Sequence, residues 1–269
     1  MAISVKRFSE LVERVAPLAC AYDWDNSGLT LHQHDRVERV FICLDITEET
    51  LREAIECGCD TILSHHPLLF SAQKKFSCAA PVDQLFLQAV HAGLNLYAAH
   101  TSYDCAPGGM NEQLAKLLGL EERRPLVAQS WNAQGEMTSG IGVIGVYERA
   151  LAPAEFAEKV KQVLKLPVLR MADGGREIRK VACVGGAGSE FLADAARAGA
   201  DAFLTGEVKH NYYAEAQVLG MTLVEAGHYD TEKIFIDALR EGLQNAQNEL
   251  NSKIEVMCPQ RKKRPYEFC

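Results

Sequence analysis

The chain is 269 residues long, a length typical of two small domains. It carries 28 Lys and Arg against 36 Asp and Glu, and the formal net charge of −8 argues against general nucleic-acid binding. With 48% hydrophobic and 24% charged residues it can bury a sizeable core, which excludes disorder as its main state. No apolar run approaches the ~20 residues of a membrane-spanning helix, and segment 1–15 has the pattern of an amphipathic helix, not of a signal peptide.

Apolar runs of strand length alternate with helical patterns along most of the chain. In chain order, strands are expected at 40–47, 61–64, 94–99, 140–148, 180–184, 202–204 and 221–225. Helices are expected at 48–56, 82–92, 109–118, 153–164, 189–198, 208–219 and 231–248. This alternation predicts an α/β fold with mixed or parallel sheets covered by helices.

The stretch 121–140 fits these patterns poorly. It holds Arg123-Arg124-Pro125 and the turn formers Gln134-Gly135. We therefore place a domain boundary there, which predicts an N-terminal α/β lobe at 1–125 and a C-terminal α/β lobe at 126–269.

An internal repeat relates the two lobes. Residues 40–64 align without a gap onto 181–205, a constant shift of 141, with seven identities in 25 positions. Coincidence is the alternative, because unrelated βαβ units share helix-stop and strand signals. Duplication is the interpretation we favour, and it predicts two similar lobes with a ligand site in the crevice between them, past the strand ends.

Two adjacent histidines, His65 and His66, leave the end of one predicted strand. Neighbouring side chains of a regular strand point to opposite faces, so both can serve one site only where the backbone turns. Pro67 directly after them supplies such a turn. A hydrogen-bonded pair of loop histidines is the structural alternative to metal binding.

Two further polar clusters follow predicted strands. His100 and Asp104 come after one strand, and His228 and Glu232, four residues apart, open the last helix on one face. Asp104 can equally be a turn residue or helix cap, and a glutamate in a first helical turn is favoured by the helix dipole. The informative feature is that every cluster lies at a strand end.

Imidazole and carboxylate candidates without a thiolate suit Zn, Mn, Fe, Co or Ni, and they are too rich in nitrogen for a calcium site. Five of these candidates together exceed what one catalytic ion normally takes from protein, so a pair of ions fits the count better. The nine cysteines include no CxxC pair, which argues against a thiolate zinc or thioredoxin-like site. We therefore expect a reducing, cytoplasmic location, and we single out Cys105, beside Asp104, as the thiol to watch for oxidation.

A set of motifs occurs in one order along nearly the whole chain, from about Phe8 to the final helix. They are Trp24 to Leu29, Ser64-His65-His66-Pro67, His100-Thr101 with Asp104, Thr205-Gly206-Glu207, and Gly227-His228 with Glu232. In these motifs the chain resembles the Nif-three-like dinuclear metal-centre proteins, the GTP cyclohydrolase I type 2 homologues. The resemblance implies two similar α/β lobes, a two-metal site between them and a ring-shaped homohexamer. It also implies the metal ligands His65, His66, Asp104, His228 and Glu232, with Asp104 as the bridge.

The chain departs from the family pattern after Thr205-Gly206. The family often has aspartate and a later histidine there, whereas this chain has Glu207 and His210. We regard both as candidates for a catalytic general acid or base, and a solvated helix start is the alternative. The segment between the lobes is short, so no large inserted domain is expected. The Trp24 to Leu29 motif either brings Asp25 or Asn26 to the rim of the site or is a tight turn.

Two further motifs have weaker functional interpretations. Gly185 to Ser189, between a strand and a helix, resembles a phosphate-cradling turn, but it lacks the full dinucleotide fingerprint and the Walker lysine. The basic run Arg261 to Arg264 is short, and we interpret it as a solvated tail.

The leading hypothesis for the function is a metal-dependent hydrolase with two divalent ions, acting on a nucleotide or cyclic amide. If the family name applies, the substrate is the guanine ring of GTP. The alternative is a non-enzymatic metal-holding or regulatory protein, since the same ligands serve either role. Expected partners are a small-molecule substrate and further copies of the chain, without membrane or nucleic acid.

Overall fold

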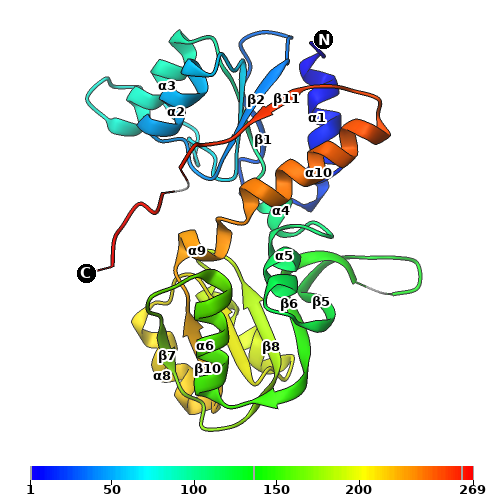
Figure 1. The fold of residues 1–269 in the computed structure, drawn as a ribbon, viewed down its shortest axis with the longest axis vertical. Helices are drawn as coiled ribbons and strands as arrows, with labels where there is room; N and C mark the ends of the chain where they lie inside the picture. The colour runs from blue at the N-terminus through cyan, green and yellow to red at the C-terminus, as the bar shows by residue number, and fades with distance from the viewer. Residues whose placement is uncertain (1, 136, 262, 269) are drawn as a thin grey trace. The chain divides into compact units, whose positions relative to one another are not determined.

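The computed structural model describes residues 2–135, 137–261 and 263–268. The chain forms two compact units (Figure 1). The first unit comprises Met1–Ala106 and Phe235–Lys262, and the second comprises Pro107–Ile234 and Lys263–Cys269. This division differs from the predicted one, which places the boundary at residue 125 and assigns the whole C-terminal segment to the second lobe.

The first unit has a five-stranded sheet with helices packed on it. Its helices are α1 (Val5–Glu13), the 3₁₀ helix η1 (Leu18–Cys20), α2 (Glu48–Glu56), α3 (Pro81–His91), α4 (Thr101–Asp104) and α10 (Phe235–Glu249). Its strands are β1 (Gly28–Leu31), β2 (Arg39–Cys43), β3 (Thr61–Ser64), β4 (Asn95–Ala98) and β11 (Glu255–Met257). The order is β1-β4-β3-β2-β11, in which only β1 runs antiparallel to its neighbour. Figure 1 shows β11, from the far end of the chain, beside β2.

The second unit has a six-stranded mixed sheet. Its helices are α5 (Met110–Leu117), α6 (Pro153–Leu164), the 3₁₀ helix η2 (Ser189–Phe191), α7 (Leu192–Arg197), α8 (His210–Leu219) and α9 (His228–Glu232). Its strands are β5 (Glu121–Trp131), β6 (Met137–Leu151), β7 (Arg170–Ala172), β8 (Ile178–Val184), β9 (Ala202–Thr205) and β10 (Thr222–Glu225). The order is β5-β6-β8-β9-β10-β7, with β8, β9 and β10 parallel and the other pairs antiparallel. The predicted α/β class with mixed sheets is confirmed.

The stretch 121–140 is not a loose linker but most of a β-hairpin formed by β5 and β6. Gly135, at φ 78°, makes the predicted turn, and its N–H donates to the carbonyl of Asn132. Pro125 lies inside β5, where it is tolerated because β5 is the edge strand of its sheet. The charged residues of an exposed edge strand hide the alternation that identifies a half-buried strand.

The two units share one framework, which supports duplication. The β2–β3 pairing runs from Val40 opposite Thr61, and the β8–β9 pairing runs from Val181 opposite Ala202, the same register under the shift of 141. The element order α1-β1-β2-α2-β3-α3-β4-α4 recurs as α6-β7-β8-α7-β9-α8-β10-α9, with a 3₁₀ turn before α7. The last parallel strand of each repeat pairs with an antiparallel edge strand: β4 pairs with β1, and β10 pairs with β7.

One hydrogen-bonding device is repeated with the framework. An Asp60 carboxylate oxygen accepts from the N–H groups of Glu38 and Arg39, at 2.8 and 3.1 Å. The equivalent Asp201 oxygen accepts from Arg179 and Lys180, at 3.1 and 2.8 Å. Each carboxylate therefore ties the start of one strand to the strand before it in the chain.

The unit boundaries follow from where two helices bury their apolar faces. α5 follows the first repeat but packs in the second unit, where Leu114 and Leu118 belong to the core. α10 follows the second repeat but packs in the first unit against α1 and β2. The chain thus crosses between the units after each repeat, which explains why the predicted boundary differs from the observed one.

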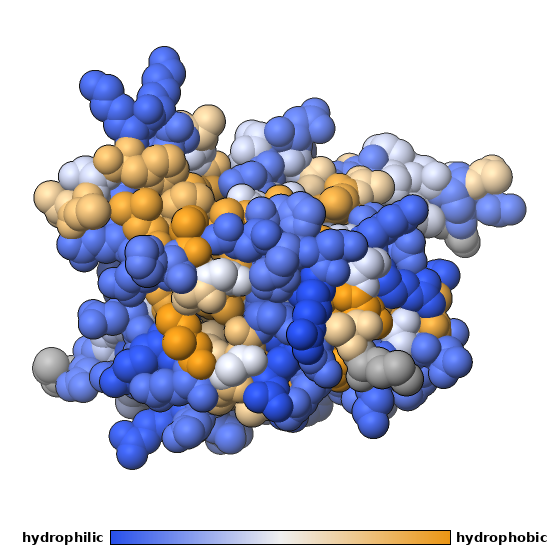
Figure 2. Space-filling view, turned by 90° about the horizontal axis from the view of Figure 1, so that it is seen from above, coloured by the Kyte–Doolittle hydropathy of each residue, from blue (hydrophilic) through white to orange (hydrophobic). Residues whose placement is uncertain are grey.

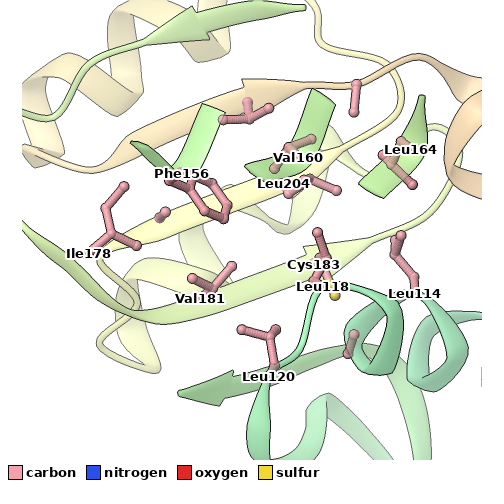
Figure 3. Packing of buried hydrophobic residues seen from close by; sticks show 14 of the residues in the cluster. Leu114, Leu118, Leu120, Phe156, Val160, Leu164, Ile178, Val181, Cys183 and Leu204 are labelled. Carbon is pink, nitrogen blue, oxygen red and sulfur yellow. The ribbon is translucent and has the colours of Figure 1, made fainter. Parts of the chain in front are cut away.

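The core of the second unit is built between α6 and the sheet (Figure 3). Phe156, Val160 and Leu164 recur every four residues on α6, so they form one apolar stripe. They belong to the same buried cluster as Val181 of β8 and Leu204 of β9. Burial of each such side chain contributes about 2 kcal/mol and fixes the strand ends that carry the candidate site.

The surface in Figure 2 mixes hydrophobic groups with hydrophilic ones. Trp24 and Phe70 are among the exposed large hydrophobic residues, at 65% and 53% exposure. Among the described helices, none combines the length and apolar composition needed to cross a bilayer.

Candidate metal-binding site

Three imidazoles gather at the strand ends of the first unit. His65 and His66 follow β3, and His100 follows β4 as the N-cap of α4. The candidate ligand atoms of all three lie within 4.8 Å of one another, an arrangement that could hold a metal ion. Sequence analysis placed His100 in a strand-end cluster but did not assign it as a ligand. The parallel register of β3 and β4 is the reason that it lies with the other two.

Each of these imidazoles has its Nδ1 proton fixed by an acceptor. Nδ1 donates to the Ala99 carbonyl in His65 (2.9 Å), to Asp45 in His66 (2.7 Å) and to Asp25 in His100 (2.7 Å). The lone pair is therefore on Nε2 in all three rings, the nitrogen that can bind a metal. The Ala99 carbonyl, Asp45 and Asp25 thus orient the three rings, as the hydrogen-bond partners of metal-bound histidines do.

The Asp25 carboxylate is the most strongly held acceptor of this group. Its side chain has no exposed surface, and it accepts hydrogen bonds from His100, Ser27, and both the N–H and hydroxyl of Thr101. Burial raises its pKa, but the bonds from His100, Ser27 and Thr101 outweigh burial and leave the pKa well below the usual aspartate range. Asp25 is therefore ionised at neutral pH and holds His100 in place.

Asp104 ends α4 and faces His65. Its Oδ1 lies 3.7 Å from His65 Nε2, and its side chain is 14% exposed. A carboxylate beside Nε2 lone pairs gives a donor set typical of a divalent transition metal. The first unit therefore brings three of the five predicted ligands together: His65, His66 and Asp104.

The second unit brings the other two predicted ligands together. His228 and Glu232 lie on one face of α9, with His228 Nε2 3.0 Å from a Glu232 carboxylate oxygen. His228 Nδ1 donates to Glu207 at 2.8 Å, so both ring nitrogens of His228 face a carboxylate. Glu207 follows β9 and Glu232 is 4% exposed. The pair resembles the first unit's histidines in that a carboxylate orients the imidazole.

Gly186 makes room for this pair. A Cβ at this position would lie 2.2 Å from Glu232 Oε1 and 3.2 Å from His228 Nε2, and the backbone has φ +62°. Only glycine therefore fits both the space and the conformation. The backbone of Gly186 therefore lies directly against the side chains of His228 and Glu232.

The glycine-rich turn 185–189 supports this pair instead of offering its N–H groups to a phosphate. The N–H groups of Gly185, Gly186 and Gly188 donate to side chains, at 2.8 to 3.0 Å. The acceptors are Asn111, Thr231 and Thr205. These three N–H groups are not available to a phosphate, so the phosphate-cradle interpretation has no structural basis at those positions.

The two predicted catalytic residues lie near the β9 end of the second unit. Glu207 is 60% exposed and in contact with His228, whereas His210 is exposed at the first residue of α8. A cavity of about 340 Å³ opens beside Glu207. It is lined by Ala187, Ser189, Glu190, Glu207, Val208, Lys209, Tyr212 and Glu225.

The sequence pattern does not point to Asp45, and it leaves the role of Asp25 open. Asp45 comes two residues after β2, next to β3 in the sheet, and this adjacency is the signal that could have identified it. The Trp24 to Leu29 motif supplies Asp25 against His100, while Asn26 donates its side-chain amide to the Leu69 carbonyl. Cys105 is 1% exposed and burial raises the pKa of its thiol, so the predicted susceptibility to oxidation is not supported.

The whole chain is similar to known proteins. A family model described as Duf34/NIF3 (NGG1p interacting factor 3) matches residues 3–265. A Clostridium acetobutylicum protein named GTP cyclohydrolase 1 type 2 homolog is 27% identical over 270 residues, covering 100% of both chains. A Streptococcus pneumoniae protein of the same name is 31% identical over 263 residues, covering 94% of this chain and 95% of its own. The crystal structure of a Staphylococcus aureus hypothetical protein has a TM-score of 0.91 and 26% identity, covering 100% of both chains.

Proposed function

The chain belongs to the Duf34/NIF3 family, and from this membership and the strand-end donors we propose a function. The protein is a dinuclear metal-binding hydrolase that acts on a nucleotide or a cyclic amide, as the relatives named GTP cyclohydrolase 1 type 2 homologs suggest. The observation that carries the proposal is the repeated donor arrangement: imidazoles with a fixed Nδ1 proton beside a carboxylate, in each unit.

The residues that would hold two divalent ions are the five predicted ligands. They would be His65, His66, Asp104, His228 and Glu232, and the family resemblance implies Asp104 as the residue that both ions would share. Their imidazole and carboxylate chemistry suits Zn, Fe, Mn, Co or Ni. When bound, the ions would supply Lewis acidity for the hydrolysis.

The chain's own residues would prepare this centre and move protons. Asp45 and the Ala99 carbonyl orient His66 and His65, so that Nε2 is the ligand atom of each. Glu207 orients His228, and its exposed carboxylate, with His210, would exchange protons with the substrate. The cavity beside Glu207 would receive part of the substrate.

We also propose that six chains form a ring, as the family resemblance implies. Size-exclusion chromatography with light scattering measures this directly. A hexamer gives six times the mass of one chain, and a monomer or dimer contradicts the proposal.

The hydrolase proposal is tested with metal-reconstituted protein, a panel of GTP, phosphoesters and cyclic amides, and metal analysis by mass spectrometry. We expect two ions per wild-type chain and turnover of at least one substrate. Asp104→Ala should lose bound metal and turnover, whereas His91→Ala, which removes an exposed histidine on α3, should behave as wild type. Equal turnover by Asp104→Ala would contradict the proposal. Two bound ions without turnover of any substrate would favour the metal-holding alternative.

A further inference from the structure

The C-terminal tail, residues 263–268, is fastened to Asp230, which lies between His228 and Glu232 on α9. Asp230 has no exposed surface. Arg264 donates from Nε to both of its carboxylate oxygens, at 3.0 and 2.8 Å. Lys233 donates to it at 2.6 Å, and the Tyr266 hydroxyl lies 3.4 Å away. The tail is therefore bound to the element that carries two predicted ligands.

The two cations also connect α9 to the end of α6. Arg264 donates to the Lys165 carbonyl at 3.2 Å, and Lys233 donates to the Leu164 carbonyl at 2.5 Å. A buried carboxylate is costly unless charged donors satisfy it, so loss of one cation weakens the whole arrangement. The basic tail that sequence analysis interpreted as solvated is thus, at Arg264, a structural contact.

α9 depends on contacts with its surroundings, and those of Asp230 are among them. It is five residues long, and helices this short are not stable by themselves. It begins after Gly227, at φ +86°, where an added Cβ would lie 2.7 Å from the Tyr266 hydroxyl. The tail therefore closes directly over the start of the helix.

The corresponding short helix of the first repeat, α4, has a different residue at this position. Tyr103 lies three residues after the N-cap of α4, as Asp230 does on α9, and it packs edge-on against Phe235 with ring centroids 5.4 Å apart. At this position α4 therefore buries an aromatic ring, whereas α9 buries a carboxylate that accepts from Lys233 and from Arg264 of the tail.

We propose that Arg264 and Tyr266 are positioning residues for the metal ligands, and that the tail acts as a latch that sets the geometry of His228 and Glu232. The inference rests on the proposed function, because it takes these two residues as ligands. The class of ligand concerned is a divalent transition-metal ion.

The test compares full-length variants by titration with Zn²⁺ and by the absorption spectrum of the Co²⁺-loaded protein. Arg264→Lys keeps the charge but loses the paired Nε contacts, and Tyr266→Phe removes only the hydroxyl. Arg261→Lys is the matched control, because Arg261 is an exposed residue of the same basic run. We expect Arg264→Lys to lower Zn²⁺ affinity about tenfold or more and to change the Co²⁺ spectrum, Tyr266→Phe to do so less, and Arg261→Lys to match wild type.

The outcomes separate the two proposals. If wild-type protein binds neither ion, the proposed function fails. If wild type binds and Arg264→Lys shows unchanged affinity and an unchanged Co²⁺ spectrum, the latch is wrong. A lower melting temperature with an unchanged spectrum also contradicts it, since the tail then only stabilises the fold. If Arg264→Lys does not fold, Tyr266→Phe decides by the same two readouts.

Discussion

The two repeats have the same framework and different chemistry at their strand ends. Where β3 leads to His65 and His66, the equivalent β9 leads to Gly206 and Glu207. A side chain cannot stand at Gly206, because its Cβ would lie 2.6 Å from the Gly186 carbonyl oxygen. The same backbone position thus carries the buried side chain of His65 in one repeat and has no room for a side chain in the other.

The hydrogen bonds that join the strands are the same in the two repeats, whereas the residues at the strand ends differ. Asp60 and Asp201 make the same pair of hydrogen bonds at strand starts. At the other end of β2, Asp45 orients His66, while Gly186, the residue equivalent to Asp45, makes room for Glu232. The repeated framework therefore carries candidate ligands in each unit, at different positions of the repeat.

The largest expected effect comes from filling the space that the second repeat keeps empty. Gly186→Ala should lower metal affinity about a hundredfold, because its Cβ would displace the Glu232 carboxylate in a strained backbone. Gly185→Ala is the matched control, since the nearest atom to its Cβ is 3.6 Å away. Isothermal titration with Zn²⁺ measures both. Equal Zn²⁺ affinity for the two variants would show that metal binding does not need the space at Gly186.

The next effect concerns the carboxylate that holds His100 in the first repeat. The pKa of Asp25 is lowered in the folded protein, so its contribution to stability is complete above the unfolded value of about 4 and is lost as pH falls below it. Asp25→Asn should lower the free energy of unfolding of the metal-free protein by about 2.5 kcal/mol at pH 7. The difference from wild type should shrink below pH 4. Urea unfolding at several pH values measures it, and a difference that grows in acid would contradict the assignment.

A smaller and equal effect is expected from the duplicated framework contact. Asp60→Ala and Asp201→Ala each remove one carboxylate that accepts from two backbone N–H groups. Each should cost about 2 kcal/mol of stability, because charge-assisted bonds are lost and two donors are left without them. Thermal unfolding measures the pair. A large loss in one variant with none in the other would break the equivalence of the repeats.

The smallest effect is expected at the cysteines, where the units should behave alike. Cys43 of the first unit and Cys183 of the second are both fully buried, and burial raises the pKa of each thiol, that of Cys183 to about 12. Both should resist a thiol reagent at pH 7.5 in the native state, while the exposed Cys78 reacts. Peptide mass spectrometry reads the result, and labelling of Cys183 as fast as Cys78 would contradict it.

Sequence periodicity was sufficient for most of the fold. Alternating strands and helices predicted the α/β class, and the shift of 141 that aligns Gly58 with Gly199 also aligns the observed strand registers. These features are local or repeated, so they are visible in one sequence. The strand-end clusters likewise include His65 and Asp104, which the fold places 3.7 Å apart.

The remaining features depend on contacts between residues distant in sequence. Asp45 orients His66 only because β2 and β3 are neighbours in the sheet, and Arg264 contacts Asp230 only because the tail returns to α9. Pro125 suggested a linker because proline is excluded from central strands. It lies in β5, an edge strand, where proline is tolerated. The packing of α5 in the second unit and of α10 in the first also depends on distant contacts, and the hydrophobic periodicity of each helix does not reveal it.

Crystals of the metal-reconstituted protein, measured on both sides of the metal absorption edge, test the central claim most directly. The account predicts two anomalous peaks per chain, with His65, His66, Asp104, His228 and Glu232 as the protein ligands. A single ion held only by the three histidines of the first unit, or peaks bound to other residues, would contradict it.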